Sequence, residues 1–137
     1  MGDLAESANP IDPSILSRNL REEREGFWVS KTRRIVSYPS LGHDLFYELE
    51  DNSFWFKHRN DCILAIMRRY PPQGSLLDVG GGNGFVSSAL KRSGYSAVLI
   101  EPGDSGARHA WERGVRPVIC ATLEEVGFPK SSWSAVG

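Results

Sequence analysis

Four glycines that follow an aspartate are the residues of this chain whose types and spacing best suit chemistry. Asp78 lies within a short apolar run, and the glycines after it are Gly80, Gly81, Gly82 and Gly84. Glycines at this spacing allow a tight turn in which the backbone approaches a ligand closely, because no Cβ intervenes. The run Ser75–Val79 predicts a buried parallel strand, and Phe85–Arg92 has the apolar spacing of a helix. Together they predict the first half of a nucleotide-binding βαβ unit.

The spacing of the glycines indicates which class of nucleotide ligand the loop could bind. A dinucleotide fingerprint, G-x-G-x-x-G, would need its third glycine where Phe85 stands. The motif D-x-G-x-G-x-G resembles instead the first motif of class I S-adenosylmethionine-dependent methyltransferases. The resemblance implies S-adenosylmethionine as cofactor and S-adenosylhomocysteine as product, with the loop against the methionine and ribose part. A dinucleotide site and a glycine turn without a ligand remain as alternatives.

An acidic residue ends the next predicted strand. Ala97–Ile100 is an apolar run, and Glu101 follows it. A carboxylate at this position is placed to accept hydrogen bonds from the two hydroxyls of a ribose. The alternative for Glu101 is a solvated side chain at a strand end. The methyltransferase resemblance further implies that Asp78 orients the loop and the amino end of the cofactor.

The resemblance continues through the next two elements and then changes. Ser105–Arg113 predicts a second helix, and Pro117–Ala121 predicts a third strand. Thr122 stands where the family usually has an acidic residue near the adenine ring, so the implied adenine contact comes from its hydroxyl or its backbone. The segment Phe128–Val136 resembles the family's turn into a fourth strand, with Ser134 in place of a frequent aspartate.

These elements predict an α/β fold, a Rossmann-like doubly wound parallel sheet with flanking helices. Residues 52–137 are expected to form the methyltransferase domain and residues 1–51 an N-terminal extension. Methyltransferase domains normally continue with further strands, so the 137-residue sequence is expected to be truncated after the start of the fourth strand. An unpaired sheet edge would favour a homodimer.

The N-terminal half has weaker signals. The first residues are expected to be disordered, and Asp12 caps a predicted short helix that ends near Gly26. Phe27–Val29 and Arg34–Tyr38 predict a small hairpin. A longer helix is predicted for Phe54–Tyr70, before two prolines.

Aromatic residues begin the longer helix. The segment from Asn52 to Asn60 resembles one that precedes the glycine motif in many methyltransferases. Phe54, Trp55 and Phe56 are predicted chiefly to pack in the core, since aromatic residues at helical spacing are usually buried. The alternative is a cation–π contact with the cofactor's sulfonium.

Composition limits the partners. Sixteen basic and 17 acidic side chains give a net charge of −1, which does not favour nucleic acid or an anionic membrane. No apolar run is long enough to span a bilayer, and no leader segment is evident. Cys62 and Cys120 are expected to be core residues in a reducing, cytoplasmic setting, and the three histidines show no metal-binding pattern. A basic cluster on the longer helix is predicted to be its solvated face: Lys57, Arg59, Arg68 and Arg69.

Two functional hypotheses follow from the sequence. The first is an S-adenosylmethionine-dependent methyltransferase with a small-molecule acceptor, a class that includes sugars and lipid-linked molecules. The acceptor and the catalytic base are not identified by any motif. The second is a non-catalytic, truncated cofactor-binding half-domain that self-associates.

Overall fold

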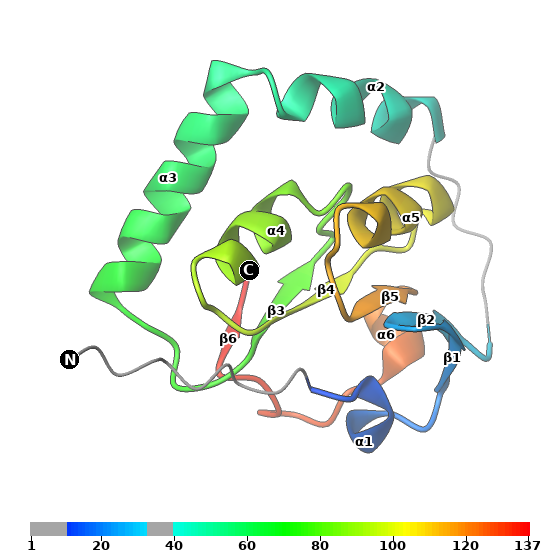
Figure 1. The fold of residues 1–137 in the computed structure, drawn as a ribbon. Coiled ribbons are helices and arrows are strands. Elements are labelled where there is room, and N and C mark those ends of the chain that lie inside the picture. Colours follow the sequence, from blue (N-terminus) through cyan, green and yellow to red (C-terminus); the bar gives the residue numbers. More distant parts are fainter. Residues whose placement is uncertain (1–10, 33–39) are drawn as a thin grey trace.

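A computed structural model describes residues 11–32 and 40–137 (Figure 1). Its centre is a six-stranded sheet in the order β1-β2-β5-β4-β3-β6. The strands are β1 (Leu20–Arg24), β2 (Phe27–Ser30), β3 (Leu76–Val79), β4 (Ala97–Ile100), β5 (Val118–Cys120) and β6 (Ala135–Val136). The helices are α1 (Pro13–Leu16), α2 (Ser40–Glu50), α3 (Phe54–Arg69), α4 (Phe85–Arg92), α5 (Asp104–Glu112) and α6 (Leu123–Val126).

The sheet is mostly parallel. Only β1 and β2 pair antiparallel, whereas β2–β5, β5–β4, β4–β3 and β3–β6 are parallel pairs. From β3 the chain moves first to β4 and β5 on one side and then to β6 on the other side. This reversal makes the neighbourhood of β3 a topological switch point, where doubly wound folds bind their ligands. The predicted α/β class is confirmed, and the topology is compatible with a Rossmann-like fold.

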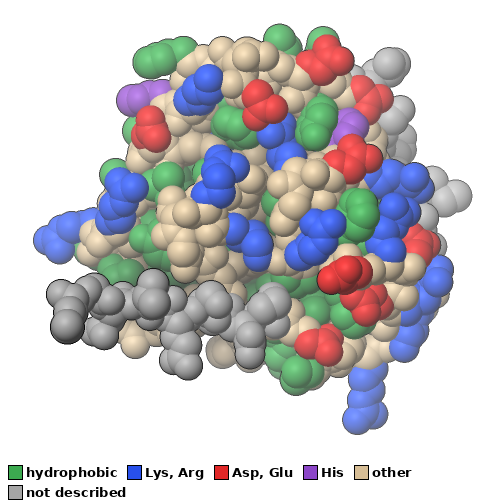
Figure 2. All heavy atoms as spheres, viewed as in Figure 1, with side chains coloured by type: hydrophobic (Ala, Val, Ile, Leu, Met, Phe, Trp, Pro, Cys, Tyr) green, Lys and Arg blue, Asp and Glu red, His purple; other side chains and the backbone are tan. Residues whose placement is uncertain are grey.

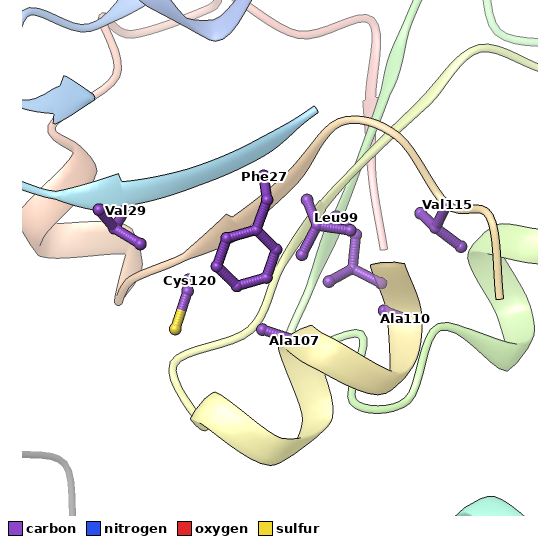
Figure 3. Packing of buried hydrophobic residues seen from close by; sticks show 8 residues of the cluster. Phe27, Val29, Leu99, Ala107, Ala110, Val115 and Cys120 are labelled. Atoms are coloured by element: carbon purple, nitrogen blue, oxygen red, sulfur yellow. The ribbon is translucent and has the colours of Figure 1, made fainter. Parts of the chain in front are cut away.

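Alternating side chains of the strands build a core on both faces of the sheet. Leu99 of β4 faces α5, where it packs with Phe27 of β2 and with Ala107 and Ala110 (Figure 3). Val98 and Ile100 of the same strand pack on the opposite face with Val126 of α6. All four residues of β4 are buried, as expected for a strand covered on both faces. The core therefore fixes β4 and the loop that follows it.

The N-terminal elements differ from the sequence predictions. The helix that begins at Pro13 ends at Leu16, and the residues expected to continue it form β1. Pairing with β2 supplies the backbone hydrogen bonds of β1, so tertiary context overrides local helix propensity. The hairpin therefore precedes its expected position, turning at Gly26, and the predicted strand Arg34–Tyr38 lies outside the described residues.

This hairpin belongs to the main sheet. Phe27 pairs in register with Val118 of β5, and Val29 pairs with Cys120. Both Phe27 and Val29 are buried in the cluster beside α5. The N-terminal segment thus covers the outer edge of β5, an edge for which the sequence predicted no partner.

Helix α3 packs on the rest of the protein through only some of its apolar side chains. Ile63, Leu64 and Met67 contact the cluster formed by β3, β4 and α4. Phe54 and Trp55, which the sequence predicted to pack in the core, are 81% and 61% exposed, so that prediction is wrong for both, and Cys62 is exposed as well. The prediction of a core position is therefore wrong for Cys62, because none of the described elements covers its side of α3, whereas Cys120 is buried in β5 as expected.

Candidate functional site

A cleft of about 520 Å³ opens beside the glycine loop, next to the ends of β3 and β4. Its volume lies in the range typical of small-molecule sites. Its floor comes from the segments that follow the two strands, and its roof comes from α2 and the start of α3. The lining residues are His43, Phe46, Glu50, Trp55, Phe56, Gly80, Gly82, Asn83, Glu101 and Pro102.

The four glycines of the motif have different surroundings. Gly80 and Gly82 line the cleft, both with positive φ (+73° and +53°), and a Cβ on Gly80 would meet no atom within 4 Å. Gly81 faces the core, where a Cβ would lie 2.7 Å from the Leu99 side chain. Gly84 caps α4, and a Cβ there would lie 2.7 Å from Cβ of Ala110 in α5. Gly80 and Gly82 therefore face the cleft, whereas Gly81 and Gly84 allow close packing within the protein.

Backbone hydrogen bonds fasten the loop to β4. The amides of Gly80 and Gly81 both donate to the carbonyl of Ile100, at 2.8 and 3.1 Å. The amide of Gly84 donates to the carbonyl of Gly81 at 3.0 Å, which closes the turn. The loop conformation is consequently set by the register of β3 and β4.

Glu101 lies at the centre of the floor and is only 5% exposed. Its Oε2 accepts a hydrogen bond from the amide of Gly82 at 2.9 Å, and its Oε1 accepts one from the amide of Gly103 at 2.7 Å. An ionised carboxylate offers about four acceptor positions, so two remain for other donors. The Glu101 side chain is therefore a buried hydrogen-bond acceptor that joins two loops, and not a solvated side chain at a strand end.

Asp78 lies behind the loop and is not among the lining residues. Its Oδ2 accepts a hydrogen bond from the Ser87 hydroxyl of α4 at 2.6 Å. Burial raises the pKa of Asp78; the Ser87 hydrogen bond and the charge of Arg59 oppose this increase, whereas the charge of Glu101 adds to it. The geometry gives Asp78 a role in shaping the loop from beneath.

Thr122 is engaged elsewhere. It follows β5 and caps α6, where its hydroxyl accepts from the amide of Glu125 at 3.2 Å. The Glu125 carboxylate accepts in turn from the amide of Thr122 at 2.8 Å, which completes a capping box. The structure thus brings Gly80, Gly82 and Glu101 together at the cleft, whereas the other predicted site residues do not line it: Asp78, Gly81, Gly84 and Thr122.

The part of the roof that α2 forms contains residues to which the sequence analysis gave no role. His43 of α2 lies with Nε2 3.8 Å from Oε1 of Glu101. Its ring occupies a slot left by two glycines, since a Cβ on Gly103 or Gly106 would lie 3.0 or 2.8 Å from it. The apolar spacing of Leu45 and Leu49 was the available sequence signal for α2, but nothing in it indicated a site.

Polar contacts over long sequence separations hold α2 in place. Nδ2 of Asn83, in the glycine loop, donates to the carbonyl of His43 at 2.9 Å. Arg113, just after α5, donates through Nη2 to Glu50 at 2.9 Å and through Nη1 to Asp51 at 2.7 Å. Nε of Arg113 donates to the carbonyl of Asn83 at 3.0 Å. These contacts connect α2 directly with the glycine loop.

Arg59 differs from its predicted place on a solvated face. Its guanidinium lies 5.4 Å from the ring centroid of Trp55 and 5.1 Å from that of Phe56, both of which line the cleft. Burial raises the pKa values of both Asp78 and Glu50, and the charge of Arg59 opposes this increase. Its Nε is buried and has no hydrogen-bond partner within residues 11–32 and 40–137. The Arg59 guanidinium therefore lies against the rings of Trp55 and Phe56, which we name the aromatic wall of the cleft.

No protein-family model and no curated protein matches this chain. Among the described residues, no helix has the length and apolar character needed to cross a bilayer. Within the same residues, no group of three or more His, Cys, Asp and Glu side chains is arranged to hold a metal ion.

Proposed function

We propose that this protein is an S-adenosylmethionine-dependent methyltransferase that acts on a small molecule. The observation that carries the proposal is Glu101, a buried carboxylate on the floor of the cleft, tied to the amide of Gly82. A nucleoside needs an acceptor for its two ribose hydroxyls and a loop without side chains beside it. Glu101, Gly80 and Gly82 supply both features at one place.

The donor set of the cleft fits the rest of an adenosyl compound. The open space at Gly80 accommodates atoms close to the backbone. Arg59 does not line the cleft, but its guanidinium lies against the rings of Trp55 and Phe56, and its positive charge there favours the carboxylate of an amino-acid moiety. Arg59 is thus added to the residues proposed from the sequence.

When bound, S-adenosylmethionine supplies a methyl group that its sulfonium already activates. The work left to the protein is to position the acceptor and to exclude water. The roof formed by α2 and the start of α3 suits that task, because it covers the floor from the opposite side. Asp78 shapes the loop, and the catalytic base stays unassigned.

Calorimetry tests the proposal. We expect S-adenosylhomocysteine and S-adenosylmethionine to bind the chain, and NAD to bind far more weakly. Preferential binding of NAD would contradict the proposal and favour a dinucleotide site. Binding of the adenosyl compounds with no methyl transfer to any member of a broad acceptor panel would favour the non-catalytic, self-associating alternative.

A further inference from the structure

Helix α2 turns its polar side toward the protein. Its Asp44 accepts from the Ser105 hydroxyl of α5 at 2.7 Å, and its Glu50 accepts from Arg113 at 2.9 Å. On its outer side, Leu45 and Leu49 are 61% and 48% exposed, and Phe46, which borders the cleft, is 49% exposed. A surface helix normally buries its apolar side against the core. The reversed orientation leaves an apolar surface uncovered by the described residues.

The start of α3 extends this surface. Trp55 is 61% exposed, and its ring meets Phe56 edge-on at a centroid distance of 5.2 Å. Phe56 in turn meets Phe46 of α2 edge-on at 6.2 Å, so aromatic contacts connect the two helices. We name Leu45, Phe46, Leu49 and Trp55 the apolar shelf. Hydrophobic side chains reach the surface at the top of Figure 2, where Figure 1 places α2 and its junction with α3.

The apolar shelf is continuous with the cleft. Phe46 and Trp55 belong both to the shelf and to the lining that contains Gly80, Gly82 and Glu101. A molecule lying on the shelf can therefore extend one end to the glycine loop. Contiguous exposed apolar surface of this kind marks a binding site more often than a scattered exposed leucine does.

The charges beside the shelf limit what it binds. The segment from residue 40 to residue 51 contains Asp44, Glu48, Glu50 and Asp51, and it has neither Lys nor Arg. Helices that bind anionic membranes carry basic residues beside their apolar face, so this segment does not suit such a surface. Glu50 and Asp51 already pair with Arg113, and Lys57 and Arg59 follow Trp55 on α3, so the charges around the shelf have both signs and favour neither an anion nor a cation. The occupant that fits is neutral and apolar.

We infer that the apolar shelf binds the apolar body of a neutral methyl acceptor, with an aromatic or branched aliphatic skeleton. Its reactive group enters the cleft between Phe46 and the glycine loop. This inference rests on the proposed function, which supplies the methyl donor. Trp55 and Phe46 are the residues that select the acceptor class, and Glu101 and the glycines bind the donor.

The test uses 2-naphthol, a neutral aromatic probe, titrated into the protein and followed by its own fluorescence. We expect Trp55→Ala to weaken probe binding by about tenfold, as for loss of an aromatic anchor, and Phe46→Ala to act in the same direction. Ile66→Ala is the matched control, because Ile66 is equally exposed on α3 but does not line the cleft. It should change probe binding less than twofold.

Calorimetry with S-adenosylhomocysteine on the same samples separates the two proposals. Probe binding that depends on Trp55, together with no binding of S-adenosylhomocysteine, would support an apolar site and overturn the methyl donor. Normal S-adenosylhomocysteine binding with probe binding unchanged in Trp55→Ala would overturn the shelf. Two further results would also overturn the shelf as an acceptor site. One is a dimer, seen by light scattering, that Trp55→Ala abolishes, and the other is binding to phosphatidylcholine vesicles that Trp55→Ala abolishes. In these cases a second copy or a membrane would cover the shelf.

Discussion

The floor and the roof of the cleft are built in different ways. The floor, which comprises the glycine loop and Glu101, directly follows buried strands and is fastened by backbone amides, such as Gly80 to Ile100 at 2.8 Å. The roof consists of α2 and the start of α3, and α2 is held by side chains distant in sequence, such as Arg113 with Glu50. The two walls face each other across one cleft. A change in the floor should therefore affect the whole fold, whereas a change in the roof should affect α2 alone.

Gly84→Ala should have the largest effect. The substitution adds a Cβ 2.7 Å from Ala110 and forces a side chain to a φ of +75°. Overpacking costs about 1–3 kcal/mol and the left-handed backbone about 1–2 kcal/mol, so the free energy of unfolding should fall by roughly 2–5 kcal/mol. Gly94→Ala is the control, since its φ is +87° but no atom lies within 4 Å. Urea denaturation should show only about 1–2 kcal/mol for the control, and equal losses would mean that α4 and α5 do not need this close contact.

Arg113→Met tests whether the roof opens independently of the floor. Removing the guanidinium leaves Glu50 without its partner at 2.9 Å, and loss of one member of such a buried pair costs about 3 kcal/mol. Hydrogen exchange should accelerate in α2 and remain slow in β3 and β4. Arg108→Met, at an exposed position of α5, is the control and should change neither. Uniform acceleration across the sheet would show that the two walls form one cooperative unit.

Glu101→Gln addresses the function of the floor. The amide keeps one carbonyl acceptor but loses the charge and the second carboxylate oxygen, which accepts from a loop amide. Calorimetry should show S-adenosylhomocysteine binding weakened by about 2 kcal/mol, as for a hydrogen bond to a charged group. Glu124→Gln, exposed on α6, should leave binding unchanged. Equal affinity in wild type and Glu101→Gln would remove Glu101 from the binding site.

Asp78→Asn should have the smallest effect, visible in the pH dependence of stability. Burial raises the folded-state pKa of Asp78 above the ordinary value of 3.8, so the folded state binds more protons than the unfolded state just above that pH. The contribution of Asp78 to stability is therefore greatest below pH 3.8 and decreases as the pH rises through the folded-state pKa. Urea titrations across this range should show a weaker decrease in Asp78→Asn. An identical slope in both proteins would assign the pH dependence to other groups.

The floor was the predictable part of the molecule. The predicted helix Phe85–Arg92 and the predicted strand Ala97–Ile100 match α4 and β4 residue for residue. Glycines and buried apolar runs restrict the backbone locally, so their pattern is enough to locate a strand, a turn and a helix. The placement of Glu101 beside the loop follows from the same register, because neighbouring parallel strands end at one edge of the sheet.

The amino-acid sequence by itself thus determined the α/β class, the glycine loop and the position of Glu101. Only the tertiary structure decided that Leu20–Arg24 pairs as β1, that α2 forms the roof, and that Arg59 lies behind the aromatic wall. These features depend on contacts between distant residues, such as Arg113 with Glu50 and Asn83 with His43. A side chain's periodicity shows that it lies on a helix face, but its partner on another element determines whether that face is turned to the core, to a ligand or to solvent.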